Sequence, residues 1–291
     1  MRNILILLTL AVSLMAKPHI AVSYPYIADI TKNIAGSSVD ITILASGKND
    51  PHFIVPKPSL IAALRSVDAI IINGAELESG WLHPLLNKAA NKKLNLNAST
   101  HLDLSKRVTL IDKPRLVDRI VGDVHKDGNP HFHLDPRNTP ILADAIFELL
   151  VELDGSKKSE YEKNLAAFKS SWQSNLDRWS SAMSAKKGLR VIQYHDIFAY
   201  FNRAYGLVNI ETIEPYPGLA PSSKHTKKLL DIISGGGADL IVHDVYHNIK
   251  TAQYLSSKGG IRIAVVPHDV GSMDSMSSLE AMFDYIVNAI K

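Results

Sequence analysis

Short apolar runs alternate along the chain with segments in which apolar residues recur every three or four positions. Residues 69–73 read Ala-Ile-Ile-Ile-Asn, and an all-apolar run of this kind is typical of a strand buried on both faces. Residues 26–35 have the pattern of a helix, which Gly36 ends. The alternation predicts parallel sheets with helices on both sides. Further strands are expected at 19–23, 39–44, 190–194, 239–243 and 261–266, and further helices at 58–65, 197–205, 226–234, 249–258 and 279–290.

One segment in the middle of the chain departs from this alternation. Residues 157–185 contain neither Gly nor Pro, and their apolar positions follow one another at steps of three and four. This spacing predicts a single amphipathic helix, about 40 Å long at 1.5 Å per residue. The positions on its apolar face are Tyr161, Leu165, Phe168, Trp172, Leu176, Trp179 and Met183.

The strand and helix pattern resumes after Gly188, so the long helix is interpreted as a connector between two similar units. The fold class predicted is α/β, with two lobes that each have a central parallel sheet flanked by helices, joined by one long rigid connecting helix. The expected boundaries are 17–155 for the first lobe, 156–188 for the connecting helix and 189–291 for the second lobe.

The first residues predict export from the cytoplasm. Arg2 precedes a short apolar stretch, and Ala16 offers a small residue at a cleavage point, so residues 1–16 are interpreted as a signal peptide. The stretch is too short to span a bilayer comfortably. The chain contains no cysteine, which leaves no site for a disulfide, a thiolate ligand or a lipid-modified cysteine. We therefore expect a periplasmic protein that is soluble after removal of the signal peptide.

The net charge of the chain is +3, and no long basic run occurs, so nucleic-acid binding has little support. The chemistry of the chain lies instead in its histidines. Three of them stand in short motifs at or just after the ends of predicted strands, where ligands of parallel sheets collect. Neutral imidazole is the commonest protein ligand for zinc. The motifs are Asp50-Pro51-His52-Phe53, Asn129-Pro130-His131-Phe132-His133-Leu134-Asp135-Pro136 and Tyr194-His195-Asp196-Ile197-Phe198.

These motifs, in this order, resemble those of the zinc and manganese solute-binding proteins of ABC importers, the cluster A-I metal-binding family. The resemblance extends over almost the whole chain after residue 16, including the long helix. Further matching segments are Pro56-Lys57-Pro58, His195 through Phe201 with Tyr205-Gly206-Leu207, and Pro217-Gly218-Leu219-Ala220-Pro221-Ser222.

The resemblance implies metal ligands at His52, His131 and His195. The fourth ligand of the family is normally a carboxylate before a glycine-containing loop near the C-terminus, where this chain reads Pro267-His268-Asp269-Val270-Gly271. Spacing from Gly271 places His268 in the ligand position, with Asp269 beside it as the alternative ligand.

Several other polar residues lie near these motifs in the sequence. Asp196 has two interpretations, as an acceptor for an imidazole N–H and as a helix N-cap. His133 stands where the family tends to carry an aromatic residue. His243, Asp244 and His247 cluster at another predicted strand end, but no family motif supports them as ligands.

The loop that is rich in histidine and acidic residues in many zinc members has no counterpart here. The corresponding residues 113–129 contain one histidine, His125, so a secondary metal-capturing loop is not expected.

We therefore expect a monomeric binding protein that captures Zn²⁺ as cargo between its lobes and delivers it to an ABC permease in the inner membrane. Three or four imidazoles suit the tetrahedral preference of zinc, whereas Mn²⁺ prefers more oxygen ligands. The alternatives are a manganese-specific protein of the same family and an exported zinc-dependent hydrolase. The sequence has no His-Glu-x-x-His motif, which disfavours the hydrolase, and a tetrapyrrole chelatase is disfavoured by the export signal.

Overall fold

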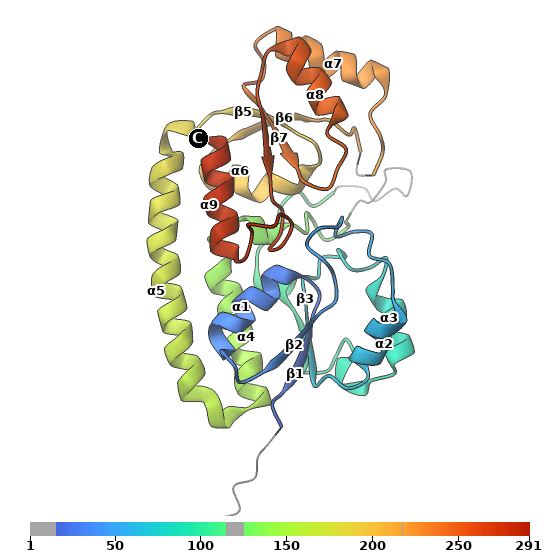
Figure 1. The fold of residues 1–291 in the computed structure, drawn as a ribbon, viewed down its shortest axis with the longest axis vertical. Helices are drawn as coiled ribbons and strands as arrows, with labels where there is room; N and C mark the ends of the chain where they lie inside the picture. Colours follow the sequence, from blue (N-terminus) through green and yellow to red (C-terminus); the bar gives the residue numbers. More distant parts are fainter. Residues whose placement is uncertain (1–15, 115–124, 217) are drawn as a thin grey trace, which may run out of the picture.

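A computed structural model describes residues 16–114, 125–216 and 218–291 of the chain. The predicted signal peptide, apart from Ala16, lies outside the described residues. Within the described ranges, no helix has the combination of length and apolar character needed to cross a membrane. Figure 1 shows two lobes, one above the other, with a long helix running along one side of both.

The first lobe is built around a four-stranded parallel sheet in the order β2-β1-β3-β4. The second lobe repeats this plan with the order β6-β5-β7-β8, again with every pairing parallel. The strands are β1 (His19–Val22), β2 (Asp40–Ile43), β3 (Ala69–Ile72), β4 (His101–Asp103), β5 (Arg190–Gln193), β6 (Val208–Thr212), β7 (Leu240–Asp244) and β8 (Ile263–Val266).

Burial of the strands follows their place in the sheet. Central strand β3 is apolar and completely buried, as expected for a strand covered on both faces, whereas edge strands β2 and β6 are largely half-exposed or exposed. The covering helices are α1 (Pro25–Ala35), α2 (Pro58–Leu64), α3 (Leu82–Ala89), α4 (Thr139–Leu153), α6 (Ala199–Tyr205), α7 (Ser223–Ser234), α8 (Lys250–Gly259) and α9 (Leu279–Ile290).

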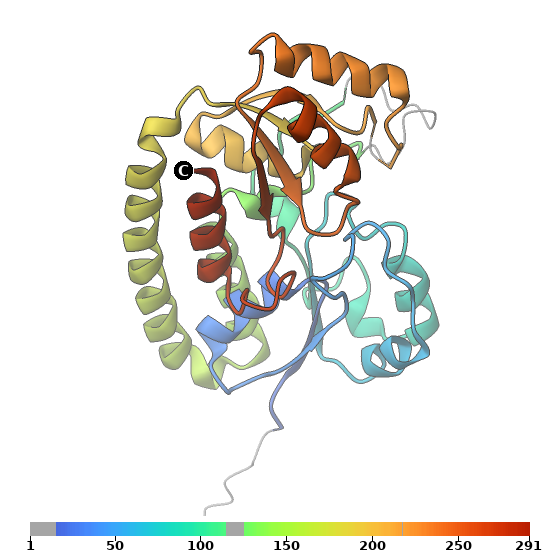
Figure 2. The ribbon, with the colours of Figure 1, turned by 45° about the horizontal axis from the view of Figure 1, so that its top comes forward.

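The long helix α5 (Lys158–Met183) lies between short 3₁₀ turns at Gly155–Lys157 and Ser184–Lys186. Its 26 residues span about 39 Å. α5 contacts α1 and α4 of the first lobe and also α9, the last helix of the chain. Figure 2 shows α9 beside α5 and reaching from the second lobe toward the first. The predicted fold class, two parallel α/β lobes with one long helix, is confirmed.

An aromatic cluster fixes α9 against α5. The rings of Trp172 and Trp179 lie 5.2 Å apart, and Phe283 of α9 lies 5.9 Å from the first and 5.1 Å from the second. Trp179 Nε1 also donates a 2.7 Å hydrogen bond to Asp284 Oδ1. Offset and edge-to-face aromatic pairs of this kind add about 0.5–1.5 kcal/mol each beyond the area that they bury.

The strand directions decide where the two lobes can share a site. In both lobes the strands end on the side that faces the other lobe, as the arrowheads in Figure 1 show. The loops after β2 and β5 therefore meet between the lobes, and these loops carry His52 and His195. A short 3₁₀ helix at Phe132–Leu134 follows His131 in the same region.

We predict that Trp179→Ala lowers the free energy of unfolding by about 3–5 kcal/mol, because it empties a buried aromatic site at the contact of α5 with α9. Urea unfolding followed by circular dichroism measures this change. Ser180→Ala, on the exposed face of the same helix, is the control and should alter stability by less than about 0.5 kcal/mol. Equal effects of the two changes would contradict the role assigned to the cluster.

Candidate metal centre

Three histidines from separate parts of the chain meet between the lobes. Among the residues that the structure describes, His52, His131 and His195 form one group whose potential ligand nitrogens all lie within 4.8 Å of one another. Their ring centroids are 5.3, 5.6 and 5.7 Å apart, and each pair of rings is close to perpendicular, at 77–89°. Three nitrogens that converge in this way match the donor set of a zinc or related transition-metal site.

The His52 ring is held by a carboxylate two residues earlier in the same loop. Asp50 Oδ1 accepts hydrogen bonds from the backbone N–H of His52 at 2.9 Å and from its Nδ1 at 2.8 Å. Burial would raise the pKa of the Asp50 carboxyl, but the hydrogen bonds and charge of His52 outweigh this effect and lower it. With Nδ1 engaged, Nε2 of His52 is the nitrogen free to bind an ion, and it is buried without a hydrogen-bond partner among the described residues.

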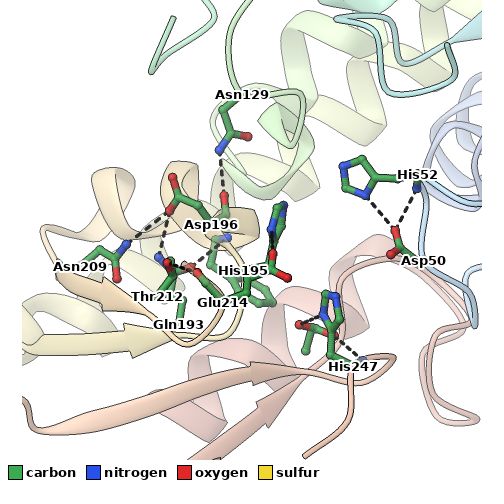
Figure 3. A network of polar contacts seen from close by, with 12 residues as sticks. Asp50, His52, Asn129, Gln193, His195, Asp196, Asn209, Thr212, Glu214 and His247 are labelled. Atoms are coloured by element: carbon green, nitrogen blue, oxygen red, sulfur yellow. Dashed lines mark hydrogen bonds and ion pairs between the residues drawn. The ribbon is translucent and has the colours of Figure 1, made fainter. Parts of the chain in front are cut away.

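A second carboxylate holds the ring of His195 in the same way. Nδ1 of His195 is paired with Oε1 of Glu214, just beyond the end of β6, as Figure 3 shows. Burial works to lower the pKa of His195, but the hydrogen bond and charge of Glu214 outweigh it and raise the pKa. Carboxylates that accept from the remote nitrogen of a metal-binding imidazole fix its tautomer and strengthen it as a ligand.

His131 differs from the other two because neither of its ring nitrogens has a hydrogen-bond partner in the described part of the chain. The side chain is buried, with 1% of its surface exposed. Burial, together with the neighbouring histidines, lowers its pKa well below the usual range, so the ring is neutral near pH 7. A buried polar atom without a partner is costly. An ion bound by this ring would satisfy one of its two unpaired nitrogens.

The two predicted candidates for a fourth ligand lie outside this group of three. Asp269 Oδ1 accepts from the backbone N–H groups of Tyr26 at 2.9 Å and Val270 at 2.6 Å, so this oxygen is already used. The ring of His268 lies edge-on to Tyr246, with centroids 4.6 Å apart, and burial lowers its pKa to about 4. His268 as the fourth ligand stays a prediction.

Asp196, which the sequence offered as an acceptor for an imidazole, contacts other groups. Its Oδ1 accepts weak hydrogen bonds from the side-chain amides of Gln193 at 3.3 Å and Asn209 at 3.4 Å. The backbone carbonyl of Asp196 accepts from the Asn129 amide at 2.8 Å, which ties the second lobe to the loop before His131. The acceptor facing His195 is Glu214.

Two further histidines adjoin the site. The His125 ring stacks on His52 with centroids 5.3 Å apart, and burial, followed by the charge of His52, lowers its pKa to about 4. His133 instead stacks on Tyr26 at 4.5 Å, and its Nε2 is 2.9 Å from the carbonyl oxygen of His268. His133 therefore joins the lobes.

Sequence reasoning missed the two carboxylates that orient the ligands. Asp50 could have been identified from the sequence, because an aspartate side chain in a proline-containing loop commonly accepts a hydrogen bond from the backbone two residues later. Glu214 follows an edge strand without an apolar run, and it lies 19 residues from His195, so no local signal joined the two.

The family described as zinc-uptake complex component A, periplasmic (ZnuA), matches residues 20–291. The metal ABC transporter substrate-binding lipoprotein SsaB of Streptococcus sanguinis is 30% identical over 200 residues, which are 66% of this chain and 60% of that protein. The manganese ABC transporter substrate-binding lipoprotein PsaA of Streptococcus pneumoniae is 30% identical over 70% of this chain and 64% of its own length. The zinc-binding lipoprotein AdcA of the same species is 22% identical over 86% and 50%. The chain thus spans about half to two thirds of the length of these relatives.

Solved structures share the fold over nearly the full chain. A crystal structure of ZnuA matches with a TM-score of 0.78 and 27% identity, covering 95% of this chain and 100% of that one. The periplasmic zinc-binding protein TroA of Treponema pallidum matches with a TM-score of 0.75 and 20% identity, covering 94% and 98%, which shows the fold alone.

We predict that Glu214→Gln lowers the pKa of His195 in the metal-free protein, because it removes the charge that raises this pKa. NMR titration of the histidine ring protons measures it. Since the raised pKa stabilises the fold below pH 6.5 and this gain is lost as pH rises through the folded-state pKa, the variant should be less stable than the wild type at pH 6. Glu211→Gln, on β6 and paired with Lys228, is the control. An unchanged His195 titration would contradict the pairing.

Asp269 gives a second prediction about pH. Burial raises its pKa to about 8, so the folded state retains a proton that the unfolded chain releases near pH 4. Stability should therefore fall as pH rises from about 4 to about 8, and Asp269→Asn should remove this loss while keeping an acceptor for Tyr26. The stability gained by the variant should grow by up to about 1.4 kcal/mol per pH unit in this window. Thermal and urea unfolding at pH 4, 6 and 8 measures the difference in stability between the variant and the wild type. A difference that stays constant with pH would contradict the raised pKa of Asp269.

Proposed function

This chain belongs to the family of the periplasmic zinc-uptake component ZnuA, and we propose that it captures a divalent transition-metal ion between its two lobes as cargo for an ABC importer. The observation that carries the proposal is the convergence of His52, His131 and His195. The ligands come from both lobes, since His52 and His131 precede α5 and His195 follows it. A single ion can then be held by both halves of the molecule.

Zinc is the cargo that the donor set favours. Three imidazole nitrogens suit a four-coordinate zinc ion, whereas manganese favours carboxylate, carbonyl and water oxygens. Two carboxylates at the site, Asp50 and Glu214, accept hydrogen bonds from Nδ1 of His52 and His195. Because these carboxylates orient imidazoles, they support a site in which nitrogen atoms bind the ion. The relatives named above include one zinc-binding and one manganese protein, so the test must compare both metals.

The alternative from another functional class is a zinc hydrolase, in which three histidines hold the ion and one coordination position is open to water. Such an enzyme needs a carboxylate that can take a proton from the bound water. Asp50 and Glu214, the carboxylates seen against the group of three, are both engaged with imidazoles. The names of the relatives point the same way, since they describe binding components of importers. Periplasmic location, a monomeric state and delivery to a membrane permease complete the proposal.

The proposal predicts one tight zinc ion per chain. Isothermal titration calorimetry of metal-free protein with Zn²⁺ should give a stoichiometry near one, and competition with Mn²⁺ should show weaker manganese binding. His131→Ala should weaken zinc binding at least tenfold, or about 1.4 kcal/mol, because it removes a buried nitrogen that no other described residue engages.

The matched control is His83→Ala, which changes an exposed histidine on α3 away from the group. It should leave the zinc dissociation constant unchanged. Absence of zinc binding, two equally tight sites, or tighter binding of manganese than zinc would each refute the proposal in this form.

A further inference from the structure

Besides His125, another imidazole adjoins the three, in the loop that follows the central strand β7. The His247 ring centroid lies 6.3 Å from that of His195. This separation exceeds the longest distance within the group of three, 5.7 Å, by 0.6 Å. In Figure 3 the His247 ring rises from the second lobe toward the space between His195 and His52. The loop that carries it joins β7 to α8, so this loop can move without a change in either sheet.

A nearby aspartate sets the orientation of the His247 ring, as Asp50 does for His52. Asp244 Oδ2 lies 2.8 Å from His247 Nδ1, and Asp244 Oδ1 accepts from the backbone N–H of His247 at 2.9 Å. Asp50 makes the equivalent pair of contacts with the ring and backbone of His52. In both cases the carboxylate engages Nδ1 and leaves Nε2 as the nitrogen available to an ion. Three of the imidazoles around the cleft are therefore backed by a carboxylate.

Neighbouring aromatic rings hold His247 in this position. Tyr194 stacks on it at 4.1 Å with an angle of 24° between the planes, and Tyr246 packs against it at 4.3 Å and 40°. The side chain nevertheless keeps 19% of its surface exposed, whereas the Asp244 side chain behind it is completely buried. An oriented imidazole with an accessible Nε2 is the arrangement that a metal ligand requires.

We propose that His247 is the fourth nitrogen ligand of the captured ion, in place of His268 or Asp269; this inference rests on the proposed function. The His268 ring packs against Tyr246, which also contacts His247. Asp269 has an oxygen committed to two backbone amides. An approach of the loop that carries His247 would bring a fourth imidazole to the group, and four nitrogen ligands suit the four-coordinate preference of zinc.

The test compares the zinc-loaded full-length chain with His247→Phe, which retains an aromatic ring between Tyr194 and Tyr246 but has no nitrogen. X-ray absorption spectroscopy at the zinc edge counts the imidazoles bound. Four are expected in the wild type and three in the variant, with the zinc dissociation constant raised at least tenfold. His247→Gln is the second variant, for use if the phenylalanine disturbs folding, and it should give the same count of three.

His225→Ala is the control, because His225 lies in the same lobe and its Nε2 is 2.8 Å from the Thr212 carbonyl oxygen, apart from the cluster. It should keep four imidazoles and the wild-type affinity. A wild-type count of three, an unchanged count and affinity in both His247 variants, or loss of one imidazole on His268→Ala would each overturn the inference while leaving the proposed function standing. A wild-type chain that takes up no zinc would instead overturn the proposed function.

Discussion

Parallel pairing of strands places the carboxyl ends of a sheet at one edge, and in this molecule two such edges face each other. The meeting of His52 and His195 follows from this constraint. The loops after β2 and β5 can meet only because both sheets direct their strand ends toward the same gap. His52 and His195 are 143 positions apart in sequence, yet their rings lie 5.6 Å apart. An antiparallel sheet would divide its strand ends between two edges and could not collect these side chains in the same way.

The lobes are joined on more than one side. Along one side, α9 packs against α5 through the cluster of Trp172, Trp179 and Phe283. Nearer the cleft, the loop after β8 is tied to the first lobe by two contacts, from Tyr26 N–H to Asp269 and between His133 and the His268 carbonyl oxygen. Contacts at both positions restrict hinge motion, so local movement of loops is the change most accessible to this fold. A small shift of the loop that carries His247 is compatible with this restraint.

Most of the fold could be predicted because its central strands and helices carry strong periodic signals. Residues 69–73 and the spacing from Tyr161 to Met183 each point to one structure. Edge strands β4 and β6 were not predicted, because β4 has only three residues, β6 is half-exposed, and neither has an apolar run that the sequence displays.

At the site, the group of three histidines was predictable and their surroundings were not. Motifs at strand ends identified His52, His131 and His195, which the structure brings together. Glu214 becomes a partner of His195 only through the tertiary fold. Spacing from Gly271 could not show that Asp269 bonds to the start of α1, since that contact joins residues 243 positions apart.

The carboxylates that contact the imidazoles also affect the charge balance around a metal ion bound between the lobes. Neutral imidazoles would leave the full charge of a dication in a poorly solvated space, which is costly without opposing charge. Asp50 and Glu214 stand directly behind two of the rings, so two negative charges are available one imidazole away from the ion. Asp244 stands in the same relation to His247. The charge that opposes a bound cation is thus supplied by groups that need never touch the metal.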